Sequence, residues 1–252
     1  MDDSPEPRAV GPHILKEGAG VVAVWKPAGL ATQAPPGIPS VESWLRARLH
    51  GDRGGYLGVP HRLDRAVSGV LLLATTPRAA RQLSRQFERR QVRKTYLAVV
   101  AADGAGASWA LGDSGASADR AATVWHDRIE KVPDEPRARI VPPEAPGGRE
   151  ALTAVRLLRT LPEGRLLLEF EPLTGRMHQL RLQASARGLP ILGDTLYGGP
   201  TPAERTGCHE GVDARERAIA LHAVRIEYTD PETAQRVAVE APLPSWWPAP
   251  QA

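Results

Sequence analysis

The aspartate at position 64 has the surroundings best suited to chemistry. It stands in the run His61-Arg62-Leu63-Asp64-Arg65, so cationic side chains lie on both sides of its carboxylate. Neighbouring positive charge favours the ionised carboxylate, which can act as a nucleophile or as a base. An aspartate in an arginine-rich turn is, however, more often a turn cap or an ion-pair partner. The run alone leaves a catalytic and a structural Asp64 open.

The histidine and cysteine residues do not form a recognisable metal site. Only Cys208 and His209 are close enough along the chain to act together, and they lie in a glycine-rich loop. The sequence has no Walker loop, no GxGxxG after a strand, no GxSxG elbow and no HExxH. We therefore expect no metal, and nucleotide hydrolysis, hydride transfer and serine or zinc hydrolysis lack their usual signatures.

Positive charge is concentrated in two segments. The whole chain has a net charge of +3, but residues 78–94 alone carry +6, with Glu88 as their only acid. Residues 174–188 contain arginines and no acid at all. Ordinary solvated faces mix both signs, so these two segments indicate binding to a polyanion.

Length and composition set the class of protein. A chain of 252 residues can bury one sizeable core or two small ones. The single cysteine, Cys208, excludes an internal disulfide and fits a reducing compartment. The N-terminus lacks the apolar run of a secretory signal, and no run approaches the roughly 18 apolar residues of a membrane span. We therefore expect a cytoplasmic protein.

The elements that would position Asp64 can be predicted from apolar runs and turn signals. Strands are expected at 21–25, 70–74, 96–100, 152–161, 165–173, 219–228 and 236–239, with one or two more around Val124 and Ile129. Helices are expected at 41–49 and after Thr76, a cap that proline follows. Because strands and helices follow one another without regular βαβ alternation, the sequence predicts an α+β fold with a mixed, largely antiparallel sheet.

A further short helix is expected after Thr174-Gly175. Met177, Leu180 and Ala184 recur there at helical spacing. This spacing places the intervening polar residues on the surface of the turn; they are Arg176, His178, Gln179 and Arg181.

The segment from Pro60 to Ala74, PHRLDRAVSGVLLLA, resembles the catalytic motif of RluA-type pseudouridine synthases. Six other blocks agree with the same family in the same order: 26–30, 94–100, 173–181, 193–199, 221–223 and 241–244. The family isomerises a uridine within RNA by detaching the base from its ribose, turning it and rejoining it through carbon 5. The resemblance implies an RNA substrate, ribosomal or transfer RNA, and no cofactor.

The resemblance also implies roles for individual residues. Asp64 would be the essential aspartate, which attacks the sugar or the base or assists removal of a sugar proton. Tyr96 would pack against the target uracil, and Arg176 would pair with Asp64. Arg62 would help to fill the space that the extruded nucleotide leaves.

Other residues have less specific implied roles. His178, Gln179 and Arg181 would touch RNA or brace the active site. Arg81 and Arg85, in the basic helix at 78–94, would be part of the RNA track, while His61 would be structural. Many relatives have threonine at the position of Val67, and we expect the change to be tolerated.

The same resemblance implies a domain organisation. Residues 1–20 would be a loose lead-in, and 21–252 a single catalytic domain with a variable excursion at about 102–150. No separate N-terminal RNA-binding domain is expected, and the protein would be a monomer.

Two rival functions are weighed against an RNA isomerase. A non-catalytic RNA-binding protein or chaperone could use the same scaffold, but the intact Asp64, Tyr96 and Arg176 argue against it. An unrelated aspartate-dependent hydrolase would leave the other six blocks unexplained.

Overall fold

The protein folds around one ten-stranded sheet, as the computed structural model shows for residues 11–18, 20–51, 54–102, 122–201 and 217–248. Its strands are β1 (His13–Gly18), β2 (Val21–Lys26), β3 (Ser68–Ala74), β4 (Arg93–Ala101), β5 (Thr123–Lys131), β6 (Ala138–Val141), β7 (Arg149–Thr160), β8 (Arg165–Pro172), β9 (Leu221–Thr229) and β10 (Arg236–Glu240). The helices are α1 (Val41–His50), α2 (Pro77–Glu88), α4 (Gln179–Ser185) and the short 3-10 helix η2 (Thr195–Tyr197).

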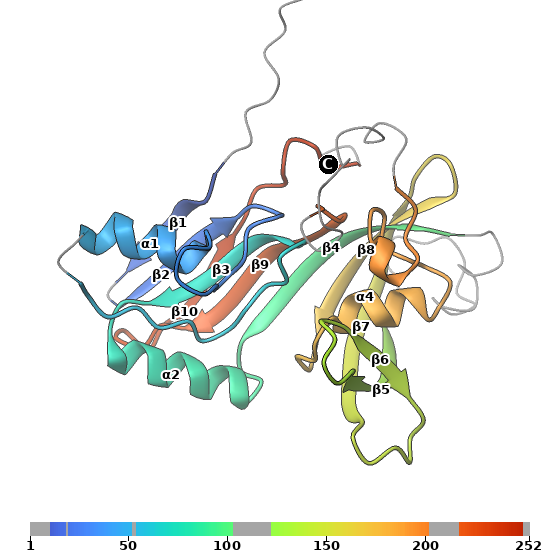
Figure 1. Ribbon diagram of the computed structural model, residues 1–252, viewed down its shortest axis with the longest axis horizontal. Helices are drawn as coiled ribbons and strands as arrows, with labels where there is room; N and C mark the ends of the chain where they lie inside the picture. The colour runs from blue at the N-terminus through green and yellow to red at the C-terminus, as the bar shows by residue number, and fades with distance from the viewer. Residues whose placement is uncertain (1–10, 19, 52–53, 103–121, 202–216, 249–252) are drawn as a thin grey trace, which may run out of the picture.

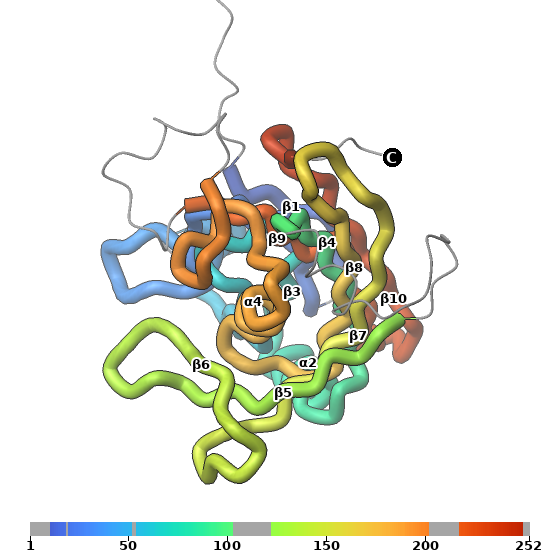
Figure 2. The backbone as a smooth tube through the Cα atoms, turned by 90° about the vertical axis from the view of Figure 1, so that its right-hand side faces the viewer, coloured from blue at the N-terminus to red at the C-terminus, as the bar shows by residue number. Residues whose placement is uncertain are grey.

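The strand order is β1-β2-β3-β9-β4-β8-β7-β5-β6, and β10 pairs with β9 beside this path. All strand pairs are antiparallel except β3 with β9. The helices lie on one face of the sheet, with α1 and α2 near β1–β3 and α4 near β5–β7 (Figures 1 and 2). The predicted α+β class with a largely antiparallel sheet is confirmed. Within the described residues, no helix is long and apolar enough to cross a membrane.

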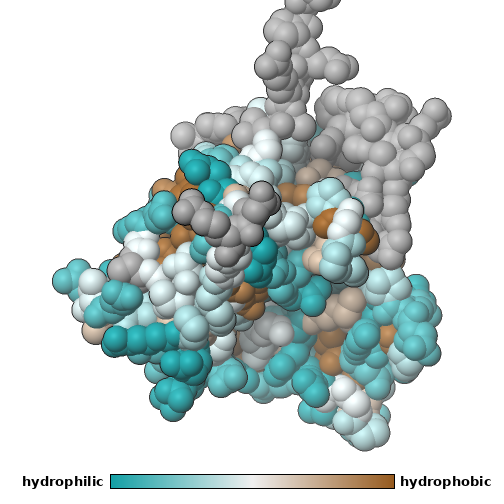
Figure 3. Space-filling view, turned by 60° about the vertical axis from the view of Figure 1, so that its left-hand side comes forward, coloured by the Kyte–Doolittle hydropathy of each residue, from teal (hydrophilic) through white to brown (hydrophobic). Residues whose placement is uncertain are grey.

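Helix α2 forms for the reasons visible in its sequence. The hydroxyl of Thr76 accepts a hydrogen bond from the Ala79 amide at 3.1 Å, and Pro77 occupies the first turn. Ala79 and Leu83 are buried on the side that faces the sheet. The arginines of α2 are left on the solvent side, and the face of the molecule that carries α1 and α2 is mostly hydrophilic (Figure 3).

Three parts of the fold differ from expectation. Residues 13–18, expected to be part of a loose lead-in, form β1 on β2. A single strand, β5, contains both Val124 and Ile129, and β6 pairs with it. Helix α4 begins only at Gln179. Gln179 and Arg181 are buried rather than on the surface, because α4 packs its polar side chains against the ends of β5 and β7 and against η2. The N-terminal ten residues, part of the 102–150 excursion and the pair Cys208 and His209 lie outside the described residues.

Two large hydrophobic clusters fill the interior. One lies between β2, β3, β9, α1 and α2, and the other between β4, β7, β8 and α4. Tyr96 on β4 packs against both. Strand β4 therefore runs along the boundary between the two clusters, and Tyr96 lies between them.

Gly69 permits the close approach of β3 to β9. Its φ is 126°, a conformation that L side chains rarely adopt, and a β-carbon there would overlap the carbonyl oxygen of Ala223 on β9. This contact sets the position of the chain that leads into β3, and so of the loop that carries Asp64.

Candidate active site

The loop that carries Asp64 is held by a buried lysine. Nζ of Lys26 donates to the carbonyl oxygens of Pro27 at 2.9 Å, Leu30 at 2.7 Å and Arg65 at 3.1 Å. Burial lowers the pKa of Lys26 to about 7, against a smaller raising effect of the Asp64 charge. Three carbonyl acceptors around one ammonium tie the segment after β2 to the residue next to Asp64.

The residue before Asp64 is also held by hydrogen bonds. The Thr32 hydroxyl donates to the Leu63 carbonyl at 2.9 Å and accepts from the Leu63 amide at 3.1 Å. Both backbone groups of the preceding residue are therefore satisfied, and the Asp64 loop is fixed at its two neighbours.

The Asp64 side chain, about one-third exposed, faces a cavity of about 1250 Å³. Seven of the nine residues expected to form the site line this cavity: Arg62, Asp64, Tyr96, Arg176, His178, Gln179 and Arg181. Arg81 and Arg85 do not line it. They are exposed on α2, and Arg85 lines a separate shallow depression with Arg236.

Arg181 is the cation that the structure places beside Asp64. Its Nη1 lies 3.4 Å from Oδ2 of Asp64, while its Nε and Nη2 donate to the two carboxylate oxygens of Asp194 at 2.6 and 2.7 Å. The side chains of Arg181 and Asp194 are 5% and 1% exposed. The two hydrogen bonds between them fix the plane of the guanidinium group. One arginine thus links the buried Asp194 to Asp64.

The expected pairing of Arg176 with Asp64 is wrong. Arg176 precedes α4, and its Nε donates to the Glu150 carbonyl at 2.8 Å. The guanidinium is thereby held at the start of β7. Arg176 still lines the cavity, so its position remains consistent with substrate contact.

His178 is a second neighbour of Asp64. Its Nε2 lies 3.7 Å from Oδ2 of Asp64, and its Nδ1 lies 2.7 Å from the Tyr197 hydroxyl. Desolvation lowers the pKa of His178 despite the Asp64 charge, so the imidazole is neutral at pH 7. Its φ of 52° is left-handed, and this conformation turns the side chain back toward Asp64 before α4 begins.

Gln179 braces the site from within the protein. Its Oε1 accepts from the Thr174 hydroxyl and the Arg176 amide, and its Nε2 donates to the Leu152 carbonyl and the Thr153 hydroxyl, all at 2.8–3.0 Å. Every hydrogen-bonding position of the amide is used, which supports bracing over RNA contact.

Tyr96 and Lys94 approach the cavity from β4. Burial and then the Asp64 charge raise the pKa of Tyr96, so its phenol keeps its proton at neutral pH. Desolvation lowers the pKa of Lys94, which makes no ion pair within the described residues. Arg62 is exposed at the cavity and likewise has no hydrogen-bond partner there.

His61 is a partly buried, neutral histidine. Its Nε2 accepts from the Leu72 amide at 2.9 Å, and its ring stacks on Phe87 with centroids 4.5 Å apart. Burial lowers its pKa to about 3, with a smaller contribution from the Lys94 charge. This arrangement supports the expected structural role.

The protonation of His61 should make the stability of the protein depend on pH. Unfolded His61 takes up a proton near its ordinary pKa of 6.5, whereas the folded state excludes it down to about pH 3. The unfolded state then binds more protons, so stability falls as the pH drops below 6.5. In urea denaturation of His61→Gln, we expect this fall between pH 6.5 and 4 to be shallower than in the wild type. An equal slope in both proteins would contradict the buried neutral state.

Sequence reasoning about residue types missed Lys26, Asp194 and Tyr197. They lie far along the chain from Asp64, and no local periodicity marks them. Their only signal was that Lys26 falls in the 26–30 block and the other two in the 193–199 block.

The geometry of the cavity defines a class of site. A fixed carboxylate lies in a cavity large enough for a nucleotide, and the cationic side chains that line it outnumber the acids. Such a site is suited to a reaction on one unit of a polyanion.

Comparison with known proteins identifies the family. The model of the family described as RNA pseudouridylate synthase matches residues 20–186. Ribosomal large subunit pseudouridine synthase C of Rickettsia bellii is 32% identical over 236 residues, 93% of this chain and 69% of the relative. tRNA pseudouridine synthase C of Salmonella typhi is 32% identical over 254 residues, 93% of this chain and 86% of the relative.

Solved structures agree with the sequence comparison. Human RNA Pseudouridylate Synthase Domain Containing 4 superposes with a TM-score of 0.68 at 25% identity, over 93% of this chain and 89% of that one. The chain belongs to the RNA pseudouridylate synthase family, and the expected resemblance to its RluA-type members is confirmed.

Proposed function

We propose that this protein converts uridine to pseudouridine in ribosomal or transfer RNA, with Asp64 as its catalytic residue. The observation that carries the proposal is Asp64 itself, tied at both neighbouring residues and paired with Arg181 at a cavity that Tyr96 also lines. The names of the Rickettsia and Salmonella relatives support the two RNA classes.

The chemistry needs space and a fixed carboxylate. The bond between N1 of uracil and C1′ of ribose breaks, a bond between C5 and C1′ forms, C5 loses a proton and N1 gains one. A stacked base cannot turn in this way, so the nucleotide must leave the stack, at a typical cost of a few kcal/mol. The cavity of about 1250 Å³ offers the room for it.

The residues around the cavity have different roles in this reaction. Asp64 attacks the sugar or the base, or assists removal of a sugar proton, while Arg181 balances its charge. Tyr96 packs against the uracil. Arg62, exposed and without a partner in the described chain, fills the gap left in the RNA stack.

The wider context is proposed on the same basis. The chain from β1 onward, and not only residues 21–252, acts as a single catalytic domain, a monomer in the cytoplasm, without a metal. Arg81 and Arg85 on α2 extend the electrostatic attraction for RNA beyond the cavity. A non-catalytic RNA-binding protein would have no need for the fixed Asp64 and its two ties.

The proposal is tested by incubating the protein with ribosomal and transfer RNA transcripts that carry tritium at C5 of uracil. We expect tritium release into water from at least one RNA, with one pseudouridine formed per tritium released. Binding of both RNAs without release, over a range of buffers and temperatures, would instead favour the RNA-binding alternative.

A further inference from the structure

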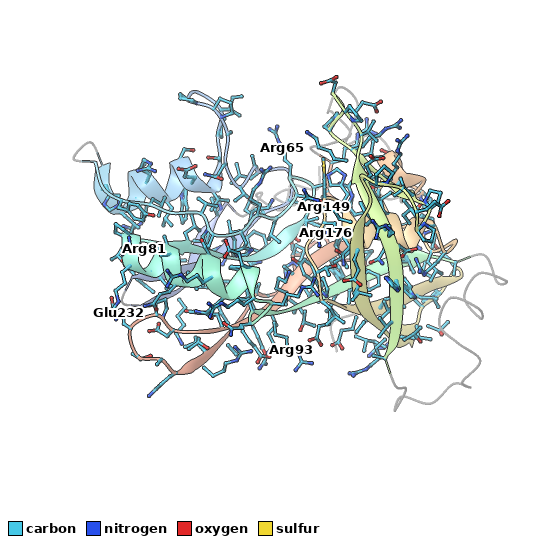
Figure 4. The ribbon with its side chains drawn as sticks, turned by 90° about the horizontal axis from the view of Figure 1, so that it is seen from below. Arg65, Arg81, Arg93, Arg149, Arg176 and Glu232 are labelled. Carbon is cyan, nitrogen blue, oxygen red and sulfur yellow. The ribbon has the colours of Figure 1, made fainter. Side chains whose placement is uncertain are left out.

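Three arginines meet at the border of the cavity: Arg90, Arg149 and Arg176, which we call the mouth arginines. They come from separate parts of the chain, because Arg90 follows α2, Arg149 begins β7 and Arg176 precedes α4. Arg90 and Arg176 line the cavity together with Asp64. Arg149 and Arg176 are labelled close together in Figure 4, whereas Arg81 lies well away on α2.

Glu150 contacts two of the mouth arginines. Its carbonyl accepts from Nε of Arg176 at 2.8 Å, its carboxylate lies 3.8 Å from Nη2 of Arg90, and Arg149 is its neighbour in β7. The same carboxylate lies 3.7 Å from Nε2 of His126. One carboxylate, 44% exposed and shared, leaves three guanidinium groups with an excess of positive charge.

This excess is unfavourable in the free protein. Desolvation first, and then the charges of Arg149 and Arg90, lower the pKa of Arg176, so these two charges lie close enough to repel it. Within the described part of the chain, the Nη atoms of Arg176 and the whole guanidinium of Arg149 have no hydrogen-bond partner. A group of like charges with free donors is the expected form of an anion site before its ligand binds.

We propose that the mouth arginines bind backbone phosphates of the RNA strand whose uridine enters the cavity. This inference rests on the proposed function and adds to it a phosphate site distinct from the Asp64–Arg181 pair. Guanidinium groups bind two phosphate oxygens at once, and a phosphodiester supplies the negative charge that Glu150 alone does not. Such contacts position the strand without recognising its bases.

The test measures how salt affects binding of a fluorescein-labelled oligouridylate, followed by anisotropy. Each phosphate contact in a single strand contributes a slope of about −0.7 to the logarithm of affinity against the logarithm of salt concentration. We expect the double variant Arg90→Gln/Arg149→Gln to weaken binding at low salt and to reduce the slope by about 0.7 or more. Arg48→Gln, the same change at an exposed arginine on α1, is the control and should leave the slope unchanged.

Two further measurements separate binding from a structural role. With tritiated RNA, the double variant should raise KM at least about 5-fold and change kcat by less than 2-fold, since phosphate contacts position the strand rather than react. Its Tm should be equal to or above that of the wild type, because like charges are removed. A salt slope equal to that of Arg48→Gln, or a lowered Tm with unchanged affinity, would overturn the proposal. In that case, tritium release by the wild type would still support the proposed function. If the wild type released no tritium, the proposed function would be rejected, but the phosphate site would not.

Discussion

Asp64→Asn is expected to lower tritium release from RNA by at least about 10³-fold, because it removes the carboxylate that we propose to be catalytic and that lies beside Arg181 in the cavity. Asparagine has nearly the same shape but neither the negative charge of a nucleophile nor a free lone pair that can accept a proton at neutral pH. The substitution leaves the fold intact, since Arg181 keeps both hydrogen bonds to Asp194.

The experiment compares single-turnover release and RNA affinity in the same preparation. Affinity of Asp64→Asn should stay within about 3-fold of the wild type, and removal of a negative charge from a cationic cavity should strengthen it rather than weaken it. Asp134→Asn is the matched control, an exposed aspartate in the turn between β5 and β6. Release by Asp64→Asn at the wild-type rate would remove Asp64 from its assigned role.

Much of the fold could be predicted because local signals and the tertiary structure agree. Helix α2 shows this most clearly: Thr76 and Pro77 mark its start in the sequence, and the structure uses them as the cap and the first turn. The fully apolar run of β3 is buried along its whole length. Where sequence and packing support the same element, pattern alone suffices.

β1 escaped prediction because it lacks that agreement. His13–Gly18 carries no apolar alternation, none of its residues is fully buried, and it forms an edge strand through backbone pairing with β2. Edge strands of this kind depend on a partner that is already in place, which no local window of sequence records.

The partner of Asp64 could not be chosen for a similar reason. Arg176 and Arg181 are both arginines in one acid-free segment, five residues apart. Which of them reaches Asp64 depends on where α4 begins, on the left-handed His178 before it, and on Asp194, which holds Arg181 from outside the helix. These are tertiary features, so the residues of the site could be gathered from the sequence but their pairing could not.

The Arg181–Asp194 pair leads to the second large prediction. Arg181→Met should lower the free energy of unfolding by about 3–5 kcal/mol, because it leaves the carboxylate of Asp194, 1% exposed, without its two charged donors. Urea denaturation measures this loss. Arg156→Met, which breaks a partly exposed pair with Glu169 on β8, is the control and should cost less than about 1 kcal/mol.

A second variant separates stability from catalysis at the same pair. In Arg181→Met/Asp194→Asn the buried charge is gone, so most of the lost stability should return, with a shortfall of about 1–2 kcal/mol for the missing hydrogen bonds. Tritium release should not return with it, because Asp64 still lacks the cation that lies 3.4 Å from its carboxylate. Recovery of activity together with stability would show that Arg181 acts only through the fold. Recovery of stability alone would show that this buried arginine serves two acids, one for folding and one for chemistry.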